Sequence, residues 1–405
     1  MRKSERIFLL PFHDEIKNAR ITDIYFIRTK QILEKDNIDK VVVAAEFTVS
    51  SMPKEYEWFV FAGLREILKL LEGLPIDVYA VPEGTILTQR DIDRVRVPVM
   101  LIVGPYAKFA VYETSILGIM AAASGFATKA SRLKKLAGNI PIVNFGARRT
   151  HPALAPFCDY YSYIGGFDAV SCVLGAELLG KKPLGTMPHA LLVIYRFVRG
   201  DHAEGWKAFD KYMPDDVPRI MLCDTFSDEV EESIRAIESV GIDRIYGIRL
   251  DTPGSRKGNF GDILREVKWK LKQRGYSKVK VILSGGVNEH NIRELIAAGA
   301  DGFGIGSAVA NAPYIDFAMD IVAIQEDGKW HPICKRGKFD GRKKVWIKRE
   351  EGKIIVKVTP WNEKPEGSYE MVFEKFMENG KIIRDLPNPD KIREHVLNQL
   401  SYVHI

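Results

Sequence analysis

The sequence predicts a mixed α/β protein in which a (β/α) barrel-like domain is joined to a smaller α+β domain. From about residue 139, short apolar runs recur, and each is followed by a polar or glycine-rich turn. Helical windows such as DEVEESIRAIESV separate most of these runs, which is the pattern of a parallel sheet covered by helices. The flanking stretches instead read as short strands joined by proline and glycine turns.

The N-terminal part alternates strand and helix patterns. Residues 40–49, KVVVAAEFTV, have the composition of a strand, and residues 59–71, FVFAGLREILKLL, have the apolar spacing of an amphipathic helix. Residues 76–89 and 95–107 predict short strands. Residues 112–130 predict a long helix whose small side chains allow close packing.

Seven strand candidates form the barrel region, in the segments IPIVNFGARR, YIGGFDAVS, PLGTMPH, RIMLCDTFSD, IYGIRLDTPG, VKVILSGGVNE and DGFGIGSAV. Seven is fewer than the eight strands of a complete barrel, so a doubly wound sheet is the alternative. After about residue 325 the chain becomes basic and strand-like, and then helical. We expect residues 1–112 and 326–405 to form the smaller domain, and residues 113–325 to form the barrel.

Composition excludes several classes of protein. The net charge of +6 is mild, and basic residues do not cluster with aromatic ones, so we expect no nucleic-acid partner. The four cysteines contain no CxxC pair, which argues against a zinc module and a disulfide framework. The N-terminal apolar run IFLLPF is shorter than a signal-peptide core, and no stretch reads as a membrane span. We therefore expect a cytoplasmic protein with no membrane contact.

Charged side chains follow two consecutive strands of the predicted sheet. Asp224 and Asp251 stand where carboxylates at strand ends can accept hydrogen bonds from sugar hydroxyls or stabilise positive charge. Arg249 lies two residues before Asp251, on the same side of an alternating strand, where its guanidinium can pair with the carboxylate or with an anion.

Glycine turns follow the last two strands. Gly285 and Gly286 lie in LSGGVNE, and Gly304, Gly306 and Ser307 lie in FGIGSAV. Backbone N–H groups at such turns hold phosphate without competing side chains, and barrels often bind phosphate after their last two strands. The two turns together predict a phosphate site.

Two further features complete the candidate site. Arg148 and Arg149 end the first barrel strand and suit a phosphate, pyrophosphate or carboxylate. His189 follows a Gly-Thr turn at a predicted strand end, where an imidazole can act as nucleophile or base.

In order and number, the motifs resemble those of the nicotinate phosphoribosyltransferases, in the group that also contains the quinolinate and nicotinamide phosphoribosyltransferases. The resemblance runs nearly end to end and has the long form of archaeal members. It is carried by TDIYFIRT, FVFAGLREIL, PEGTILT, YETSILG, NFGARR, GGFDAVS, GTMPHA, CDTFSD, GIRLDTPG and KRGKFDGRKKV.

The resemblance implies roles for three residues. His189 matches the histidine that ATP phosphorylates in ATP-coupled relatives, and Phe145 matches an aromatic ring that stacks on the pyridine. Tyr25 matches a tyrosine that stacks on the opposite face from a neighbouring subunit. The implied assembly is a homodimer, or a higher multiple, with shared active sites.

The resemblance also assigns the cations and the phosphate turns. Arg148 and Arg249 match arginines near the pyridine and the sugar phosphates, and Arg149 resembles a residue that serves a second carboxylate in quinolinate enzymes. Ser171 stands where nicotinamide-specific relatives have aspartate, and a neutral hydroxyl there favours an acid substrate. The glycines that match the 5′-phosphate turns are Gly285, Gly286 and Gly306.

The implied reaction forms nicotinate mononucleotide and pyrophosphate from nicotinate and phosphoribosyl pyrophosphate, a step of NAD salvage. The implied helpers are substrate-bound Mg²⁺ and ATP as co-substrate, with no metal held by the protein alone. Asp251 and Asp224 would stabilise the sugar as pyrophosphate leaves.

Three alternatives remain. A quinolinate phosphoribosyltransferase needs extra cations and has no use for His189 or ATP, and a sensor would bind phosphoribosyl pyrophosphate without turnover. The third alternative is an unrelated barrel aldolase or isomerase. This sequence has no strand-end lysine for such an enzyme, since Lys278 and Lys280 lie early in their strand.

Overall fold

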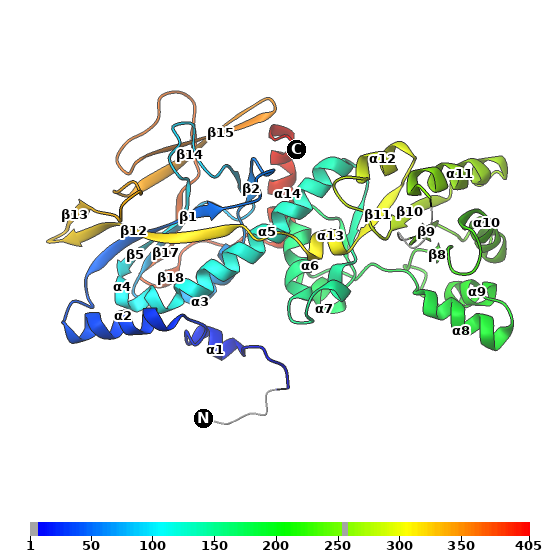
Figure 1. Cartoon of the computed structure of the whole chain (residues 1–405), viewed down its shortest axis with the longest axis horizontal. Helices are drawn as coiled ribbons and strands as arrows, with labels where there is room; N and C mark the ends of the chain where they lie inside the picture. The colour runs from blue at the N-terminus through cyan, green and yellow to red at the C-terminus, as the bar shows by residue number, and fades with distance from the viewer. Residues whose placement is uncertain (1–6, 253–257) are drawn as a thin grey trace. The chain divides into compact units, whose positions relative to one another are not determined.

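The computed structural model describes residues 7–252 and 258–405, which form two compact units (Figure 1). Unit 1 comprises Met1–Ser131, Ile164–Gly166 and Ala312–Ile405, and unit 2 comprises Arg132–Tyr163 and Phe167–Asn311. Pro253 and Gly254 of the GIRLDTPG motif lie outside the described residues.

Unit 1 is built on a seven-stranded antiparallel sheet in the order β13-β12-β1-β5-β3-β17-β18. Strand β1 lies inside this sheet and pairs with β5 on one side and β12 on the other, so an N-terminal and a C-terminal segment share one core. The strands are β1 Val42–Ser51, β3 Asp77–Ala80, β5 Pro98–Pro105, β12 Asp316–Glu326, β13 Lys329–Pro332, β17 Glu374–Glu378 and β18 Lys381–Ile382.

Two smaller sheets and a set of mostly short helices complete the described part of unit 1. The sheets are β15-β14-β16, with β14 Lys343–Glu350, β15 Lys353–Pro360 and β16 Glu370–Met371, and β2-β4, with β2 Phe59–Val60 and β4 Ile86–Leu87. The helices are α1 His13–Lys17, α2 Ile24–Lys35, α3 Leu64–Leu71, α4 Tyr106–Phe109, η1 Ala110–Tyr112, α14 Pro389–Gln399 and η3 Leu400–Tyr402.

The helix predicted over residues 59–71 is wrong in its first part. Phe59 and Val60 form strand β2, and α3 begins only after Gly63. Gly63 has φ +99°, a left-handed conformation that glycine adopts without strain and that separates the strand from the helix. Phe59 to Phe61 are all buried, so their apolar run reflects burial on every side rather than one helical face.

The long predicted helix is α5, Glu113–Ala137, which extends further than residues 112–130. Contrary to the sequence expectation, Tyr106–Ala137 is by length and hydropathy able to cross a membrane. Half of its apolar window is buried, however, and the Ser124 and Thr128 hydroxyls accept hydrogen bonds from the backbone of Ala62 and Val60. A core helix passes the same test, and α5 has the contacts of one.

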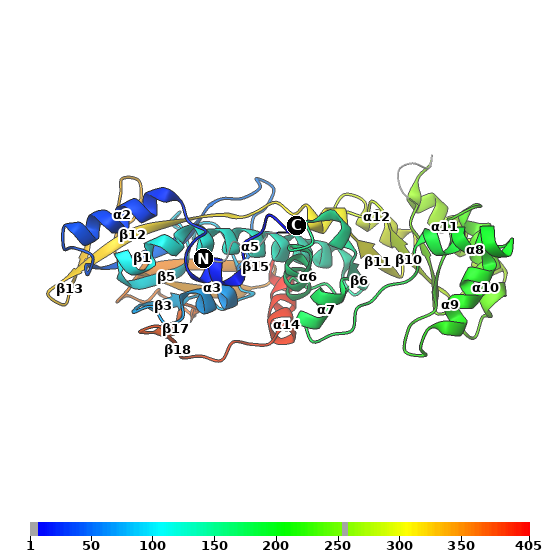
Figure 2. The same cartoon turned by 90° about the horizontal axis from the view of Figure 1, so that it is seen from below.

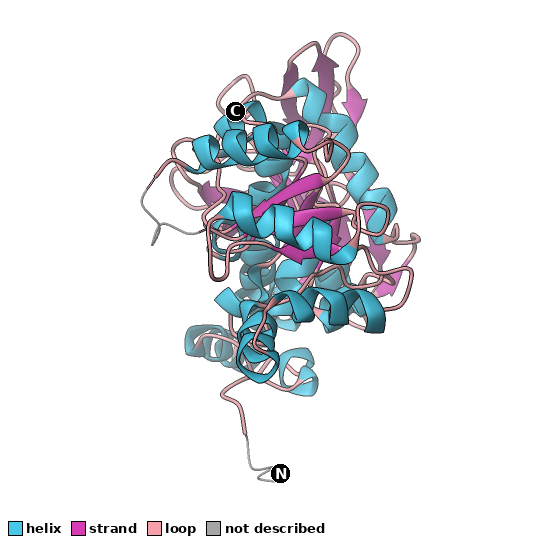
Figure 3. Ribbon diagram, turned by 90° about the vertical axis from the view of Figure 1, so that its right-hand side faces the viewer, coloured by secondary structure: helices cyan, strands magenta, loops and turns pink. Residues whose placement is uncertain are grey.

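Unit 2 contains six parallel strands in the order β7-β6-β11-β10-β9-β8. The strands are β6 Ile142–Asn144, β7 Ala169–Val170, β8 Ile220–Leu222, β9 Gly247–Leu250, β10 Lys280–Ser284 and β11 Gly302–Ile305. Their connections contain η2 Gly146–Arg149, α6 Ala155–Ile164, α7 Val173–Leu178, α8 His189–Arg199, α9 Ala203–Tyr212, α10 Glu229–Val240, α11 Phe260–Gln273, α12 Ile292–Ala297 and α13 Ser307–Ala310. Figure 3 shows helices packed around these strands.

The strand order favours a barrel over a doubly wound sheet. It follows the chain in a circle, because the last strand β11 returns to pair with the first strand β6. Among the described strands, β7 and β8 do not pair with each other, so the barrel is open there. The predicted mixed α/β fold with a parallel barrel-like sheet is confirmed.

The predicted strand in PLGTMPH is wrong. Residues 183–188 form a loop, and His189, the last residue of this segment, is the first residue of α8. The segment between β7 and β8 therefore contributes α7, α8 and α9 at the barrel opening instead of a seventh strand. Figures 1 and 2 both draw α8 and α9 side by side.

The unit boundaries differ from residues 112/113 and 325/326. The first part of α5 belongs to unit 1, because it packs on β2 through Ser124 and Thr128. Unit 1 resumes at Ala312, because β12 pairs with β1 along most of its length.

Candidate active site

The C-terminal ends of the parallel strands surround an open cleft of about 1070 Å³ within unit 2. Of the residues predicted from the sequence to form the site, all but Tyr25 line this cleft. They are Phe145, Arg148, Arg149, Ser171, His189, Asp224, Arg249, Asp251, Gly285, Gly286, Gly306 and Ser307. Residues at the ends of different strands thus meet at one place, as parallel strands require.

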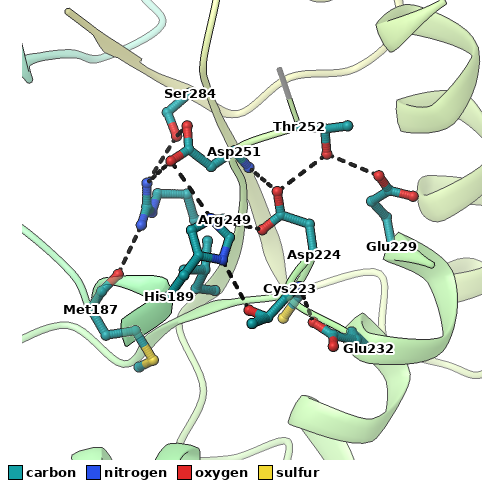
Figure 4. Close-up of polar contacts among 12 residues, drawn as sticks. Met187, His189, Cys223, Asp224, Glu229, Glu232, Arg249, Asp251, Thr252 and Ser284 are labelled. Carbon is teal, nitrogen blue, oxygen red and sulfur yellow. Dashed lines mark hydrogen bonds and ion pairs between the residues drawn. The ribbon is translucent and has the colours of Figure 1, made fainter. Parts of the chain in front are cut away.

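Arg249 connects the cleft's central groups (Figure 4). Its Nη1 donates to Asp251 Oδ2 at 3.2 Å and to Ser284 Oγ at 3.0 Å, and its Nη2 donates to the Met187 carbonyl at 2.8 Å. Its Nε donates to Thr186 Oγ1 at 2.9 Å. Arg249 is 8% exposed, and burial lowers the pKa of its guanidinium while Asp251 opposes that shift. Arg249 therefore ties the strand end of β9 to the loop that precedes His189.

Asp224 and Asp251 lie side by side after the adjacent strands β8 and β9. Asp224 Oδ2 accepts hydrogen bonds from the Asp251 N–H at 3.0 Å and the Thr252 hydroxyl at 3.3 Å. Its Oδ1 is buried and has no hydrogen-bond partner among the residues that the structure describes. Burial raises the pKa of Asp224 to about 6, against the opposing effect of His189 and together with repulsion from Asp251. The unpartnered oxygen is the atom of this pair best placed to bind a cationic group.

His189 points its ring at both carboxylates. Its Nδ1 shares a hydrogen bond of 3.1 Å with Thr225 Oγ1, while Nε2 lies 3.9 Å from Asp224 Oδ1 and 4.0 Å from Asp251 Oδ2. The side chain is 42% exposed, and it lines the cleft. Nε2 is therefore the ring nitrogen that faces the carboxylates and a bound ligand.

Phe145 follows β6 and leans against the backbone of the neighbouring strand. A Cβ added to Gly304 would lie 2.3 Å from Cδ2 and Cε2 of the Phe145 ring, so only glycine leaves room for this ring position. The Arg249 guanidinium lies 5.9 Å from the ring centroid on the cleft side. The aromatic ring and the cation thus share one wall.

The glycine turns follow β10 and β11 as predicted. Gly285 has φ +82° and Gly286 has φ +70°, and a Cβ on Gly285 would lie 3.0 Å from Asp251 Oδ1. The Asn288 and Asn291 side chains both donate to the Gly286 carbonyl, which holds the turn in place. Such left-handed turns present backbone N–H groups to anions.

The prediction that the arginine pair ends the first barrel strand is wrong, because β6 ends at Asn144 and the pair lies in the following 3-10 helix η2. Arg148 and Arg149 are exposed, and within the described residues neither guanidinium makes a hydrogen bond or an ion pair. Ser171 lines the same side, and its hydroxyl donates to the Asn144 carbonyl at 2.8 Å. Two free cations therefore remain at the cleft for an anionic ligand.

Tyr25 belongs to unit 1, on α2. Its side chain is 56% exposed and its ring lies against Phe26, with centroids 4.3 Å apart. Together with Tyr106, Glu113 and Lys335 it lines a surface pocket of about 330 Å³ in that unit.

Sequence reasoning missed the hydroxyl and carbonyl partners of these charged groups: Thr186, Met187, Thr225, Thr252 and Ser284. Each lies within three residues of a predicted site residue, so closeness to these residues in the sequence could have indicated them. The direction in which a loop hydroxyl points, however, depends on tertiary packing and cannot be predicted from a sequence motif.

Comparisons with known proteins point to one family. Residues 23–124 match the family described as quinolinate phosphoribosyl transferase, N-terminal domain, and residues 126–320 match its C-terminal domain. The chain is 27% identical over 409 residues to nicotinate phosphoribosyltransferase of Bacillus subtilis, which covers 90% of this chain and 78% of that protein.

Solved structures extend the likeness. The chain is 45% identical to nicotinate-nucleotide pyrophosphorylase from Pyrococcus furiosus, with a TM-score of 0.91 over 99% of this chain and 100% of that chain. Human nicotinic acid phosphoribosyltransferase is 17% identical, with a TM-score of 0.75 over 95% of this chain and 94% of that one, and shows the shared fold.

Proposed function

Because the chain belongs to the quinolinate and nicotinate phosphoribosyltransferase family, we propose that it forms nicotinate mononucleotide and pyrophosphate from nicotinate and phosphoribosyl pyrophosphate, in NAD salvage. The observation that carries the proposal is the cleft of unit 2. Two adjacent carboxylates, a glycine-turn anion cradle, a held aromatic ring and free arginines all lie there. Each part suits one portion of the two substrates.

In the reaction, the bond from the sugar C1 to the pyrophosphate oxygen breaks and its electron pair leaves with pyrophosphate. The pyridine nitrogen of nicotinate supplies the pair for the new N–C1 bond, with inversion at C1. Positive charge develops on the sugar as the first bond lengthens, and the Asp224 and Asp251 carboxylates stabilise it. The substrate 5′-phosphate fits the turns at Gly285, Gly286 and Gly306, beside Ser307.

Nicotinate would stack on Phe145, with its carboxylate toward Arg148 or Arg149. Stacking fixes the direction from which the ring nitrogen approaches the sugar. Ser171 adds a neutral hydroxyl at this side of the cleft, which spares the substrate carboxylate a like charge.

The site also fits Mg²⁺ carried by the substrate. Mg²⁺ binds through one or two carboxylates together with substrate phosphate oxygens, and the unpartnered Asp224 Oδ1 beside Asp251 is such a donor pair. Within the described residues no group of three or more His, Cys, Asp or Glu side chains could hold a metal alone. When bound, Mg²⁺ would neutralise charge on the departing pyrophosphate.

ATP coupling through a phosphohistidine is the finer part of the proposal. Thr225 engages Nδ1 of His189, which leaves Nε2 to receive the γ-phosphoryl group of ATP. The support is the placement of this nitrogen next to the carboxylates that would bind Mg²⁺.

We further propose a homodimer or higher multiple in the cytoplasm, with Tyr25 completing a partner's site. The exposed side chains of α8 include Val193, Ile194, Phe197 and Val198, and Tyr25 is itself half exposed on α2. Apolar helix faces of this kind are typical of subunit interfaces. All four cysteines are free, as expected in a reducing compartment.

The test measures mononucleotide formation from nicotinate, nicotinamide and quinolinate, each with phosphoribosyl pyrophosphate and Mg²⁺, with and without ATP. Wild type is compared with His189→Ala and with the control His331→Ala, an exposed histidine of unit 1. We expect turnover of nicotinate, stimulated by ATP in wild type and in the control but not in His189→Ala. Preference for quinolinate would overturn the substrate assignment, and binding without turnover would favour a sensor.

A further inference from the structure

Glu232 makes an unusual set of contacts one helical turn inside α10. Its side chain is fully buried and is not among the residues that line the cleft. Its Oε2 accepts the Thr225 N–H at 2.7 Å, and its Oε1 accepts the Phe226 N–H at 2.7 Å and the Ser227 N–H at 3.2 Å. One carboxylate therefore satisfies three consecutive backbone donors.

Those donors belong to the loop that carries the candidate catalytic groups. Asp224 immediately precedes it, and Thr225 shares its hydroxyl with His189 Nδ1. The side chain of Phe226 is 48% exposed, so the loop lies near solvent while its N–H groups turn inward. Figure 4 shows Glu232 approaching from α10, with Asp224 between His189 and Thr252. Within the described residues, no other group accepts a hydrogen bond from these three donors.

The surroundings keep the carboxylate fixed. His202 is 2% exposed, and its Nε2 lies 3.3 Å from Glu232 Oε1. The His202 ring packs edge-on against Trp206 at 4.8 Å, and the Trp206 Nε1 donates to the Leu222 carbonyl at the end of β8. Trp206 and Cys223 are completely buried, so water has little room to replace a lost contact.

We propose that Glu232 is a positioning residue for the transfer reaction: it acts through the 225–227 loop to set the places of Asp224 and, through Thr225, of His189. The inference rests on the proposed function only for its kinetic effect, because the contact itself is independent of the substrate. Misplacing a reacting group by about 1 Å can cost about 100-fold in rate, so a loop held by one carboxylate is a sensitive point.

The test variant is Glu232→Gln, which is nearly the same size and keeps one acceptor oxygen. Its amide places a donor against one of the three N–H groups, so at least one bond is lost. We expect kcat to fall by about 10- to 100-fold. The KM for nicotinate should change by less than about threefold, because Phe145 follows β6, and three strands separate β6 from β8 in the sheet order. Glu238→Gln on the exposed face of the same helix is the matched control, and it should keep wild-type kinetics.

A second variant tests the route. Thr225→Val removes the hydroxyl that contacts His189. If Glu232 acts through Thr225, the loss caused by Glu232→Gln should be smaller in the Thr225→Val background than in wild type, because the two changes break one connected network. Fully additive losses would contradict this route.

Amide hydrogen exchange supplies a readout that needs no turnover. In the full-length wild type, the amides of residues 225–227 should be protected although their loop is partly exposed, and Glu232→Gln should accelerate exchange in this segment alone. If wild type fails to convert nicotinate, the proposed function is wrong while exchange still tests the Glu232 contact. Unprotected amides in wild type would overturn the inference even if the variant does not fold. So would unchanged kcat and exchange in the variant, faster exchange across the whole barrel, or a rise in KM that matches the loss of kcat.

Discussion

Replacing Asp224 by asparagine should make the protein more stable at neutral pH while removing its activity. Asparagine keeps an oxygen that can accept the Asp251 N–H and the Thr252 hydroxyl, which now bond to Asp224 Oδ2. It removes the buried charge on Oδ1, to which no described residue donates a hydrogen bond. The side chain is only 4% exposed, so solvent does little to relieve that charge.

The magnitude follows from the pKa. Burial raises the pKa of Asp224 from 3.8 to about 6, and at about 1.4 kcal/mol per pH unit the difference corresponds to about 3 kcal/mol. The pKa of Asp224 is higher in the folded protein than in the unfolded chain. Its contribution to the free energy of unfolding is therefore fully present below pH 3.8 and is lost as the pH rises through about 6. Asp224→Asn should therefore exceed wild type in free energy of unfolding by about 3 kcal/mol at pH 7.5, and the gap should close toward pH 4.

The assay is urea unfolding of wild type and Asp224→Asn between pH 4 and pH 8. Asp228→Asn is the control, because Asp228 caps α10 through the Val230 and Glu231 N–H groups and asparagine caps equally well. Turnover of Asp224→Asn should fall by about 100- to 1000-fold, the usual loss on removing one electrostatic stabiliser. A variant that is less stable than wild type at pH 7.5, or a stability gap that does not change with pH, would refute the reasoning.

Three further predictions concern the cleft walls. Gly304→Ala should displace the Phe145 ring, because the new Cβ would lie 2.3 Å from it. In steady-state kinetics the KM for nicotinate should rise by about tenfold, with a smaller effect on kcat. An unchanged KM would show that Phe145 is not part of the nicotinate site. Gly285→Ala should lower the free energy of unfolding by about 1–3 kcal/mol in urea titrations, because φ is +82° there and the Cβ would meet Asp251 Oδ1 at 3.0 Å; equal urea midpoints would contradict the strain. Arg249→Lys keeps the positive charge but loses the forked guanidinium, whose donors reach Thr186, Asp251, Ser284 and Met187. We therefore expect kcat/KM to fall by about 100-fold. A loss below about threefold would show that the positive charge alone is sufficient.

The sequence predicted the parallel sheet and its strand ends well because those signals are local. Each strand is an apolar run, and each candidate residue follows its run directly, so parallel packing alone brings Asp224, Asp251 and the glycine turns together. The Arg249–Asp251 pair was likewise expected from their spacing on one strand face, and they lie 3.2 Å apart.

Predictions failed where tertiary context overrides the local pattern. His189 was placed at a strand end, but the apolar run after it is helix α8, because periodicity over a few residues does not separate a buried strand from a helix. Phe59 and Val60 were assigned to a helix for the same reason. The hydroxyl of Thr225 and the carboxylate of Glu232 act through backbone and side-chain directions that exist only in the folded loop.

The gap in the barrel between β7 and β8 raises the question of aggregation. Unpaired strand edges are templates on which other chains can add, and long flat edges are the most hazardous. Here the two edge strands have only two and three residues, Ala169–Val170 and Ile220–Leu222. Edges this short offer few free backbone groups to an incoming strand. The barrel can thus remain open without exposing a long edge on which other chains could aggregate. The segment between the two edge strands forms, among others, the helix that begins with His189.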